Sequence, residues 1–279
     1  MRPMNLVVQG PELSEAQARE LAGLVSTSSP KRLSGNAYRL ENARNNDSVE
    51  AWCEARRVDH AWMTEGRRFA DLRLLAMDMD STLITIECID ELGGMAGKKA
   101  EIAAITAQAM RGEIDYPESL RQRVALLEGL EEKYLQAVYE QKLRLTPGAE
   151  QLIGACKRNG VKVLLVSGGF TFFTERLKAR LGLDYTISNT LEISGDRLTG
   201  RLIGPIVDAQ AKARKFTSVG NEVQAAKAQT VAIGDGANDL GMMAEAGLSI
   251  AFHAKPVVRA QADCALTYSD LCGVLNLFE

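Results

Sequence analysis

The stretch LLAMDMDSTLIT, residues 74–85, joins an apolar run to two carboxylates. Residues 74–77 predict a short buried strand, because an uninterrupted apolar segment suits a sheet that is covered on both faces. Asp78 follows at the end of this strand, and Asp80 comes two positions later. Burying a carboxylate is costly unless another group pairs with it. Taken alone, the two acids fit either a functional site or an acidic turn in which Asp80 and Ser81 make local backbone hydrogen bonds.

Composition limits the class of protein. The chain has 279 residues, 46% hydrophobic and 25% charged, as is typical of a soluble globular protein. A net charge of −3 argues against a nucleic-acid binder, which usually has a basic domain. No apolar run approaches the ~18 residues that span a membrane, and the N-terminus lacks the apolar core of a signal peptide. We therefore expect neither a nucleic-acid nor a membrane partner.

The cysteines and histidines bear on redox state and metal type. Five cysteines, none in C-x-x-C spacing, favour reduced thiols in a cytoplasmic protein over a disulfide framework. Two histidines, His60 and His253, are too few for a histidine-rich metal site. Any metal would need oxygen ligands, which favours magnesium over zinc.

Residues 1–70 predict a small α+β domain, with a regulatory or dimerisation role as one interpretation and a homodimer as one expectation for its assembly. Ser14 and Gln17 have capping-box spacing and open an expected helix, and Asp47 and Glu50 have a similar spacing before a second. Expected strands lie near residues 6–8, 38–40 and 60–63. The charged segment 64–73 predicts a linker.

Residues 71–279 predict an α/β domain with a doubly wound, mostly parallel, Rossmann-like sheet. Short apolar strands expected at 161–167, 230–234 and 248–251 alternate with helical segments, which is typical of parallel sheets with helices on both faces. Residues 88–145 break this alternation with helical segments alone. We expect them to form a cap over the carboxyl ends of the strands, where such sheets bind ligands.

A second acidic motif, GDGANDLG at residues 234–241, follows another expected strand. It superficially resembles the dinucleotide fingerprint G-x-G-x-x-G, but Asp239 replaces the third glycine and Asp235 would face a pyrophosphate. Because both acidic motifs follow strands of one sheet, Asp78, Asp80, Asp235 and Asp239 are expected to converge. Such a cluster requires raised pKa values or a cation. An all-oxygen site of this kind suits magnesium.

Two further segments suit an anion. In VSGGF, residues 166–170, a serine and two glycines offer a hydroxyl and backbone N–H groups at a strand end. A simple strand-to-helix turn is the alternative. Lys212 is one of many lysines, and its surroundings in the sequence alone favour a solvated side chain.

DMDST, VSGG, the Lys212 region and GDGAND occur in the order found in the haloacid dehalogenase-like phosphatases. The chain resembles the phosphoserine phosphatase group most, over about residues 72–279. The resemblance implies that Asp78 attacks phosphorus to form an aspartyl-phosphate, and that Asp80 acts as general acid and then base. It implies magnesium held by Asp78, Asp235 and the backbone carbonyl of Asp80.

The resemblance also assigns supporting residues. The phosphoryl oxygens would be held by Ser167, Gly168, Lys212 and Asn238. Asp239 and Thr82 would lie behind the metal ligands. Glu87 would pair with the substrate ammonium and Arg123 with its carboxylate. Met110 and Tyr116 would line the pocket, with ordinary packing inside the cap as the alternative for both.

Helical spacing supports the role of Arg123 independently. Leu120, Val124 and Leu127 form one apolar face, and Arg123 lies on the same side of this expected helix. Snorkelling into water is the alternative for this side chain. The cap would thus present a guanidinium to the cleft.

The expected function is magnesium-dependent hydrolysis of O-phospho-L-serine to L-serine and phosphate, the last step of phosphorylated serine biosynthesis. A phosphotransferase, or a phosphatase for another small phosphomonoester, is the alternative within the family. A receiver-type signalling module, which also forms a phosphoaspartate, is an alternative from another class. Product analysis distinguishes the hydrolase from the phosphotransferase. Multiple turnover on a small phosphomonoester would exclude the receiver module.

Overall fold

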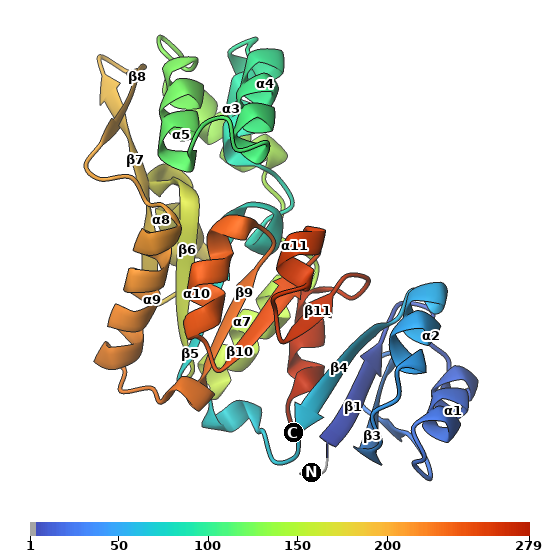
Figure 1. The fold of residues 1–279 in the computed structure, drawn as a ribbon. Coiled ribbons are helices and arrows are strands. Elements are labelled where there is room, and N and C mark those ends of the chain that lie inside the picture. Colours follow the sequence, from blue (N-terminus) through green and yellow to red (C-terminus); the bar gives the residue numbers. More distant parts are fainter. Residues whose placement is uncertain (1–3) are drawn as a thin grey trace.

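An antiparallel sheet occupies the N-terminal part of the chain in the computed structural model, which describes residues 4–279. Its strand order is β2-β3-β1-β4, with two helices on one face (Figure 1). The elements are β1 (Met4–Gln9), α1 (Glu15–Leu24), β2 (Lys31–Arg32), β3 (Ala37–Ala43), α2 (Ser48–Arg56) and β4 (Asp59–Thr64). The three predicted strands and both predicted helices of this region are present.

The helix starts were predicted with mixed success. The Ser14 hydroxyl accepts a hydrogen bond from the Gln17 N–H, and the Gln17 side chain accepts one from the Ser14 N–H, so the capping box is confirmed. The Asp47 side chain makes no capping hydrogen bond. Instead, the Asn46 side chain accepts from the Ser48 N–H at 2.9 Å, because Asn46 lies two residues before the first turn.

The predicted linker, residues 64–73, packs against the rest of the protein instead of lying free on the surface. A 3-10 turn, η1 (Phe69–Asp71), begins with Phe69, which is buried. The Phe69 ring meets the Phe278 ring edge-on, with centroids 5.4 Å apart. This aromatic contact, together with backbone hydrogen bonds from Phe69 to Glu279 and from Glu279 to Arg67, holds the segment against the C-terminal end of the chain.

The larger sheet has the order β11-β10-β9-β5-β6-β7-β8. Neighbouring strands are parallel except at the edge, where β8 runs antiparallel to β7. This confirms the predicted mostly parallel α/β fold. The strands are β5 (Leu74–Asp78), β6 (Lys162–Phe170), β7 (Tyr185–Ser194), β8 (Arg197–Ile203), β9 (Thr230–Gly234), β10 (Leu248–Phe252) and β11 (Cys264–Leu266).

Both faces of this sheet are covered. Leu75 and Met77 of β5 join a core that includes α7 (Ala149–Arg158) and α8 (Thr171–Leu181). Leu74 and Ala76 point the other way, into a core with α9 (Ala209–Glu222), α10 (Leu240–Glu245) and α11 (Pro256–Arg259). This alternation explains the uninterrupted apolar run of β5, because every one of its side chains is buried. Short turns complete the chain at η2 (Met79–Leu83), η4 (Lys227–Gln229), η5 (Ala237–Asp239) and η6 (Leu271–Leu277).

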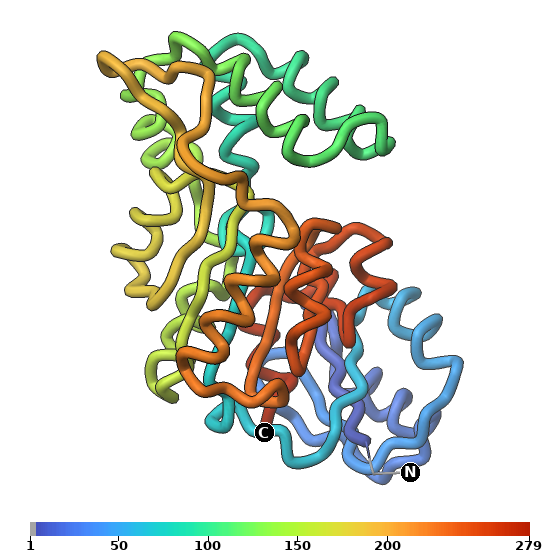
Figure 2. The backbone as a smooth tube through the Cα atoms, turned by 60° about the vertical axis from the view of Figure 1, so that its left-hand side comes forward, coloured from blue at the N-terminus to red at the C-terminus, as the bar shows by residue number. Residues whose placement is uncertain are grey.

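The cap stands over the carboxyl ends of the strands (Figures 1 and 2). It contains α3 (Cys88–Met95), α4 (Lys99–Met110), α5 (Tyr116–Ala125), α6 (Lys133–Ala137) and η3 (Val138–Lys142). The helical segments expected within residues 88–145 are interrupted near Gly129, whose φ is +80°. The Gly129 N–H there donates to the Leu198 carbonyl of β8 at 2.8 Å. The β7–β8 hairpin, which was not predicted, thus reaches up beside α5.

No helix of the described residues is both long and apolar enough to cross a lipid bilayer.

Candidate active site

The end of β5 places Asp78 beside a buried cation. Asp78 is buried, and Lys212 of α9 donates to its Oδ1 at 2.5 Å and to Oδ1 of Asp239 at 2.8 Å. Burial alone would lower the pKa of Lys212, but the charges of Asp239 and Asp78 raise it above its usual value. Lys212 is therefore a permanent positive charge in the floor of the site and not a solvated surface lysine.

Three carboxylates gather around this point. Asp78, Asp235 and Asp239 each offer one oxygen, and these oxygens lie within 4.8 Å of one another. Thr82 donates its hydroxyl to Oδ1 of Asp235 at 3.4 Å, and the Gly236 N–H donates to Oδ2 of Asp239 at 3.2 Å. The predicted convergence is therefore observed for Asp78, Asp235 and Asp239, whereas Asp80, which was predicted to join them, is not part of this cluster.

The acids repel one another. Burial, and then the charge of Asp239, raise the pKa of Asp78 well above its usual value. Burial and the charge of Asp239 raise the pKa of Asp235 to about 6. One lysine cannot balance three carboxylates, so the all-oxygen donor set fits a divalent cation. This acidic cluster is compatible with metal binding.

Asp80 is held apart from the cluster by two hydrogen bonds. The Cys88 N–H donates to its Oδ1 at 2.8 Å, and the Ser167 hydroxyl donates to its Oδ2 at 3.3 Å. Burial and the charge of Glu87 raise the pKa of Asp80 to about 7, although the Cys88 N–H opposes the shift. A carboxyl group with this pKa can give and take a proton near neutral pH.

The glycine pair after Ser167 forms a tight loop at an irregularity of β6, where its pairing with β7 shifts register between Val166 and Phe170. The Gly169 N–H donates to the Ser167 hydroxyl at 2.8 Å. A Cβ on Gly169 would lie 2.7 Å from Oδ2 of Asp80, so a side chain there would displace Asp80. The loop thus requires glycine for close approach to the acid.

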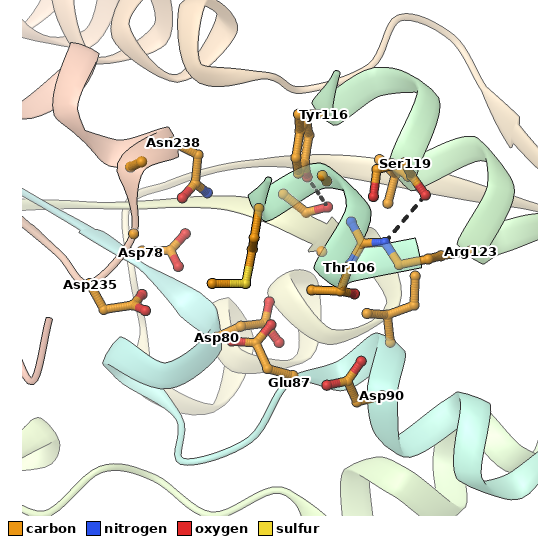
Figure 3. A pocket seen from close by; sticks show the side chains of 18 of the residues that line it. Asp78, Asp80, Glu87, Asp90, Thr106, Tyr116, Ser119, Arg123, Asp235 and Asn238 are labelled. Atoms are coloured by element: carbon orange, nitrogen blue, oxygen red, sulfur yellow. Dashed lines mark hydrogen bonds between the residues drawn. The ribbon is translucent and has the colours of Figure 1, made fainter. Parts of the chain in front are cut away.

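A cavity of about 560 Å³ separates the cap from this floor. Figure 3 shows acids of the sheet edge and of α3 facing Tyr116 and Arg123 of the cap. The predicted residues that line the cavity are Asp78, Asp80, Glu87, Met110, Tyr116, Arg123, Gly168, Asp235 and Asn238. Four others, Thr82, Ser167, Lys212 and Asp239, are buried behind its wall and act on the lining through hydrogen bonds.

The cap residues reach the cavity differently. Arg123 is half-buried, and its Nε donates to the Ser119 carbonyl at 3.3 Å. The Tyr116 hydroxyl donates to the Gly168 carbonyl at 3.1 Å, which joins the cap to the glycine loop. Met110 is 68% exposed although it lines the cavity, so it lies at the mouth. Glu87 accepts from the Ser81 hydroxyl at 2.7 Å.

Sequence reasoning missed Asp90, Thr106, Ser119 and Lys255, which also line the cavity. A signal existed for two of them. Asp90 lies three residues after Glu87 at the start of α3, and Ser119 lies four residues before Arg123 on α5, so helical periodicity places each near its predicted neighbour. Lys255 follows β10 and had no such signal.

Comparisons with known proteins agree with this geometry. A family model described as haloacid dehalogenase-like hydrolase matches residues 75–244, and one described as a domain of unknown function (DUF4072) matches residues 6–50. A phosphoserine phosphatase of Polaromonas sp. (strain JS666) is 53% identical over 221 residues, which cover 77% of this chain and 94% of that relative. The chain belongs to the phosphoserine phosphatases of the haloacid dehalogenase-like hydrolase family. The predicted resemblance is confirmed.

Solved structures of this family extend the likeness. The crystal structure of a probable phosphoserine phosphatase from Vibrio cholerae, unliganded, is 38% identical, with a TM-score of 0.86, and covers 99% of this chain and 86% of that one. A phospho-aspartyl intermediate analogue of phosphoserine phosphatase is 37% identical, with a TM-score of 0.70, and covers 75% of this chain and 99% of that one. The first of these alignments includes the small N-terminal sheet.

Proposed function

We propose that the protein hydrolyses O-phospho-L-serine to L-serine and phosphate with magnesium, as the last step of phosphorylated serine biosynthesis. The observation that carries the proposal is the cavity itself, which has Asp78 and Asp80 on its floor and Arg123 on its roof. A phosphate ester that also carries a carboxylate could place its phosphate at the floor and its carboxylate beside Arg123. The name of the 53% identical Polaromonas relative supports the choice of substrate.

In the first step, an oxygen of Asp78 attacks phosphorus, and the bond from phosphorus to the serine oxygen breaks. Protonated Asp80 gives its proton to the departing serine oxygen. Its raised pKa, about 7, supports this role because the protonated form is then populated at neutral pH. The TM-score of 0.70 with a phospho-aspartyl analogue complex supports a covalent intermediate.

In the second step, the Asp80 carboxylate takes a proton from water, whose oxygen attacks phosphorus. The bond between phosphorus and the Asp78 oxygen breaks, which releases phosphate and restores the Asp78 carboxylate. Lys212, Ser167, Gly168 and Asn238 are proposed to hold the phosphoryl oxygens. The buried Lys212 ammonium would offset the negative charge that these oxygens carry in the transition state.

Magnesium is the proposed metal, with Asp78, Asp235 and the backbone carbonyl of Asp80 as ligands. The structure has a fourth candidate ligand, Asp239, although its pairing with Lys212 favours a role behind the metal. When bound, the ion would neutralise the acid cluster and polarise the phosphoryl group. Of these two effects, the geometry of the carboxylates themselves calls for the first, because their mutual repulsion needs a cation to offset it.

The substrate ends are proposed to meet opposite walls. Glu87 lines the cavity and would pair with the ammonium, whereas the two Nη atoms of Arg123 would bind the carboxylate as a fork. Transfer of the phosphoryl group to an alcohol instead of water would use the same residues, Asp78 and Asp80, and is the alternative within the family. The cap and Asp80 argue against a receiver module, which needs neither.

The small N-terminal sheet has its own core, which contains Leu6, Leu21 and Trp52. We propose that residues 1–70 form a separate domain with a regulatory or dimerisation role, and that residues 71–279 form the phosphatase domain with its cap at about 88–145. Size-exclusion chromatography with light scattering tests the proposed homodimer.

The test of the function is phosphate release from O-phospho-L-serine and a panel of other phosphomonoesters, with magnesium and with a chelator. We expect magnesium-dependent multiple turnover that prefers phosphoserine strongly. Broad turnover would contradict the substrate assignment, and turnover unaffected by the chelator would contradict the metal. Phosphorylated alcohol in place of free phosphate would identify a phosphotransferase.

A further inference from the structure

Ser119 of α5 has a buried hydroxyl that lacks a hydrogen-bond partner among the described residues. The residue is 1% exposed, yet it lines the cavity between cap and sheet. Buried polar groups are paired in the great majority of cases, and an unpaired one in a binding cavity calls for an external partner. A hydrogen-bond acceptor on a bound ligand would be the partner of the Ser119 hydroxyl.

The position of Ser119 relative to Arg123 indicates which part of the ligand it meets. The Ser119 carbonyl accepts from Nε of Arg123 at 3.3 Å, so one residue both orients the guanidinium and places a hydroxyl beside it. Figure 3 shows the two side chains together on the cap side of the cavity. Ser119 and Arg123 therefore offer neighbouring donors.

The polar side chains that α4 and the start of α3 bring to the cavity are already hydrogen-bonded or carry a negative charge. The Thr106 hydroxyl already donates to the Ile102 carbonyl at 3.0 Å. Glu87 and Asp90, both of which line the cavity from the α3 side, are carboxylates and accept hydrogen bonds when ionised. Donors on the α5 wall and acceptors on the α3 wall fit a ligand with an anionic and a cationic group.

We infer that Ser119 donates a hydrogen bond to the carboxylate of the substrate, beside Arg123, and is a specificity-determining residue. The inference rests on the proposed function and adds a second donor to the carboxylate subsite. A hydroxyl can place its hydrogen on a carboxylate lone pair that the guanidinium fork does not use, because each carboxylate oxygen can accept more than one hydrogen bond. Hydrogen bonds to a charged group are stronger than those between neutral groups, so Ser119 contributes to selection of the amino-acid ester.

The experiment compares kcat/KM for O-phospho-L-serine with kcat/KM for O-phosphoethanolamine, which keeps the ammonium but lacks the carboxylate. In Ser119→Ala we expect the ratio of the two values to fall at least about tenfold, the effect of losing one charge-assisted hydrogen bond. The melting temperature without ligand should stay the same or rise, because the variant removes an unpaired buried hydroxyl. Thr106→Val, which removes a hydroxyl that is already paired, should keep the ratio within about twofold.

A double-mutant cycle sharpens the test. In an Arg123→Ala background the carboxylate loses its main anchor, so Ser119→Ala should change the ratio much less than it does in the wild type. An unchanged ratio in Ser119→Ala would overturn the inference, as would equal losses on both esters with a lower melting temperature, which indicate a structural role. If the wild type turns over O-phosphoethanolamine as well as O-phospho-L-serine, the proposed substrate fails and the inference fails with it.

Discussion

At the scale of single residues, the acid cluster is a set of charges that the fold alone does not balance. Asp235 is the member whose pKa is raised to about 6, chiefly by burial and then by Asp239. A carboxyl group whose pKa is higher in the folded state binds its proton more tightly when folded. Without metal, its contribution to stability is therefore fully present at low pH and lost as the pH rises through about 6.

The prediction concerns Asp235→Asn, which removes this charge and keeps the shape of the side chain. In chelator, the variant should melt close to the wild type at pH 4.5 and above it at pH 7.5, by roughly 2 °C or more. Thermal melts across this pH range measure the difference. Magnesium should raise the melting temperature of the wild type at pH 7.5 and leave the variant almost unchanged.

Asp47→Asn is the matched control, because the exposed Asp47 makes no capping hydrogen bond and lies outside the cluster. A metal-free melting difference that does not grow with pH would contradict the account of Asp235. If magnesium raised the melting temperatures of the wild type and of Asp235→Asn equally, Asp235 would not be a ligand.

The acids of the site could be predicted from the sequence because they follow strands, and strand ends meet at one edge of a parallel sheet. Lys212 could not be assigned from its own surroundings, since nothing local distinguishes it from a surface lysine. Its burial depends on Asp78 and Asp239, which come from distant parts of the chain. Ser119 could have been placed near Arg123 by helical spacing, but the sequence does not reveal that its hydroxyl lacks a partner among the described residues.

At the scale of elements, the cap meets the glycine loop through one hydrogen bond, from the Tyr116 hydroxyl to the Gly168 carbonyl. The same carbonyl also accepts from Asn189 at 2.8 Å, so the loop stays paired without the cap. A Cβ on Gly168 would lie 2.1 Å from the Tyr116 hydroxyl oxygen and 3.2 Å from its ring carbon Cζ. The fit of α5 on this loop thus depends on a missing side chain.

Gly168→Ala should therefore push the cap outward and lower kcat/KM for every phosphomonoester, by about tenfold or more, because binding requires both walls. Tyr116→Phe in the same chain removes the clashing oxygen and should recover much of the loss. Tyr116→Phe alone should cost only a few-fold, since a neutral hydrogen bond contributes about 1 kcal/mol. Steady-state kinetics of the three variants provide the measurement, and a double variant no better than Gly168→Ala would contradict the steric account.

Elements with strong apolar runs were predicted well. The expected strand at 230–234 coincides with β9, whose residues are all buried. The β7–β8 hairpin was missed because its strands are mostly half-exposed and carry polar residues, so no apolar run marks them. The turn residues Gly195 and Asp196, both with positive φ, were the available signal for a tight hairpin.

At the scale of the whole molecule, the small sheet is tied to the larger one by a buried carboxylate. Asp59 of β4 accepts hydrogen bonds from the N–H groups of Thr267, Tyr268 and Ser269 at 2.7 to 3.2 Å. Arg39 of β3 also donates to the Phe278 carbonyl at 2.6 Å. These contacts join segments more than 200 residues apart, which is why local sequence patterns did not reveal them.

Asp59→Asn should destabilise the protein by roughly 2 kcal/mol or more, because an amide group would face backbone donors that now bind a carboxylate. Urea unfolding measures this, and the lost contact should also let the small sheet unfold before the larger one. The substitution would be harmless if the contact were incidental. A wild-type midpoint and a single coincident transition in the variant would therefore contradict the account.

The central claim for the molecule is that Asp78 becomes covalently phosphorylated during turnover. The most direct measurement is rapid quenching of a phosphoserine reaction with borohydride, which reduces an acyl phosphate to an alcohol, followed by peptide mass spectrometry. The account predicts homoserine in place of Asp78 in the wild type, and neither the product nor turnover in Asp78→Asn. Reduction at another aspartate, or substantial turnover by the Asp78→Asn variant, would contradict it.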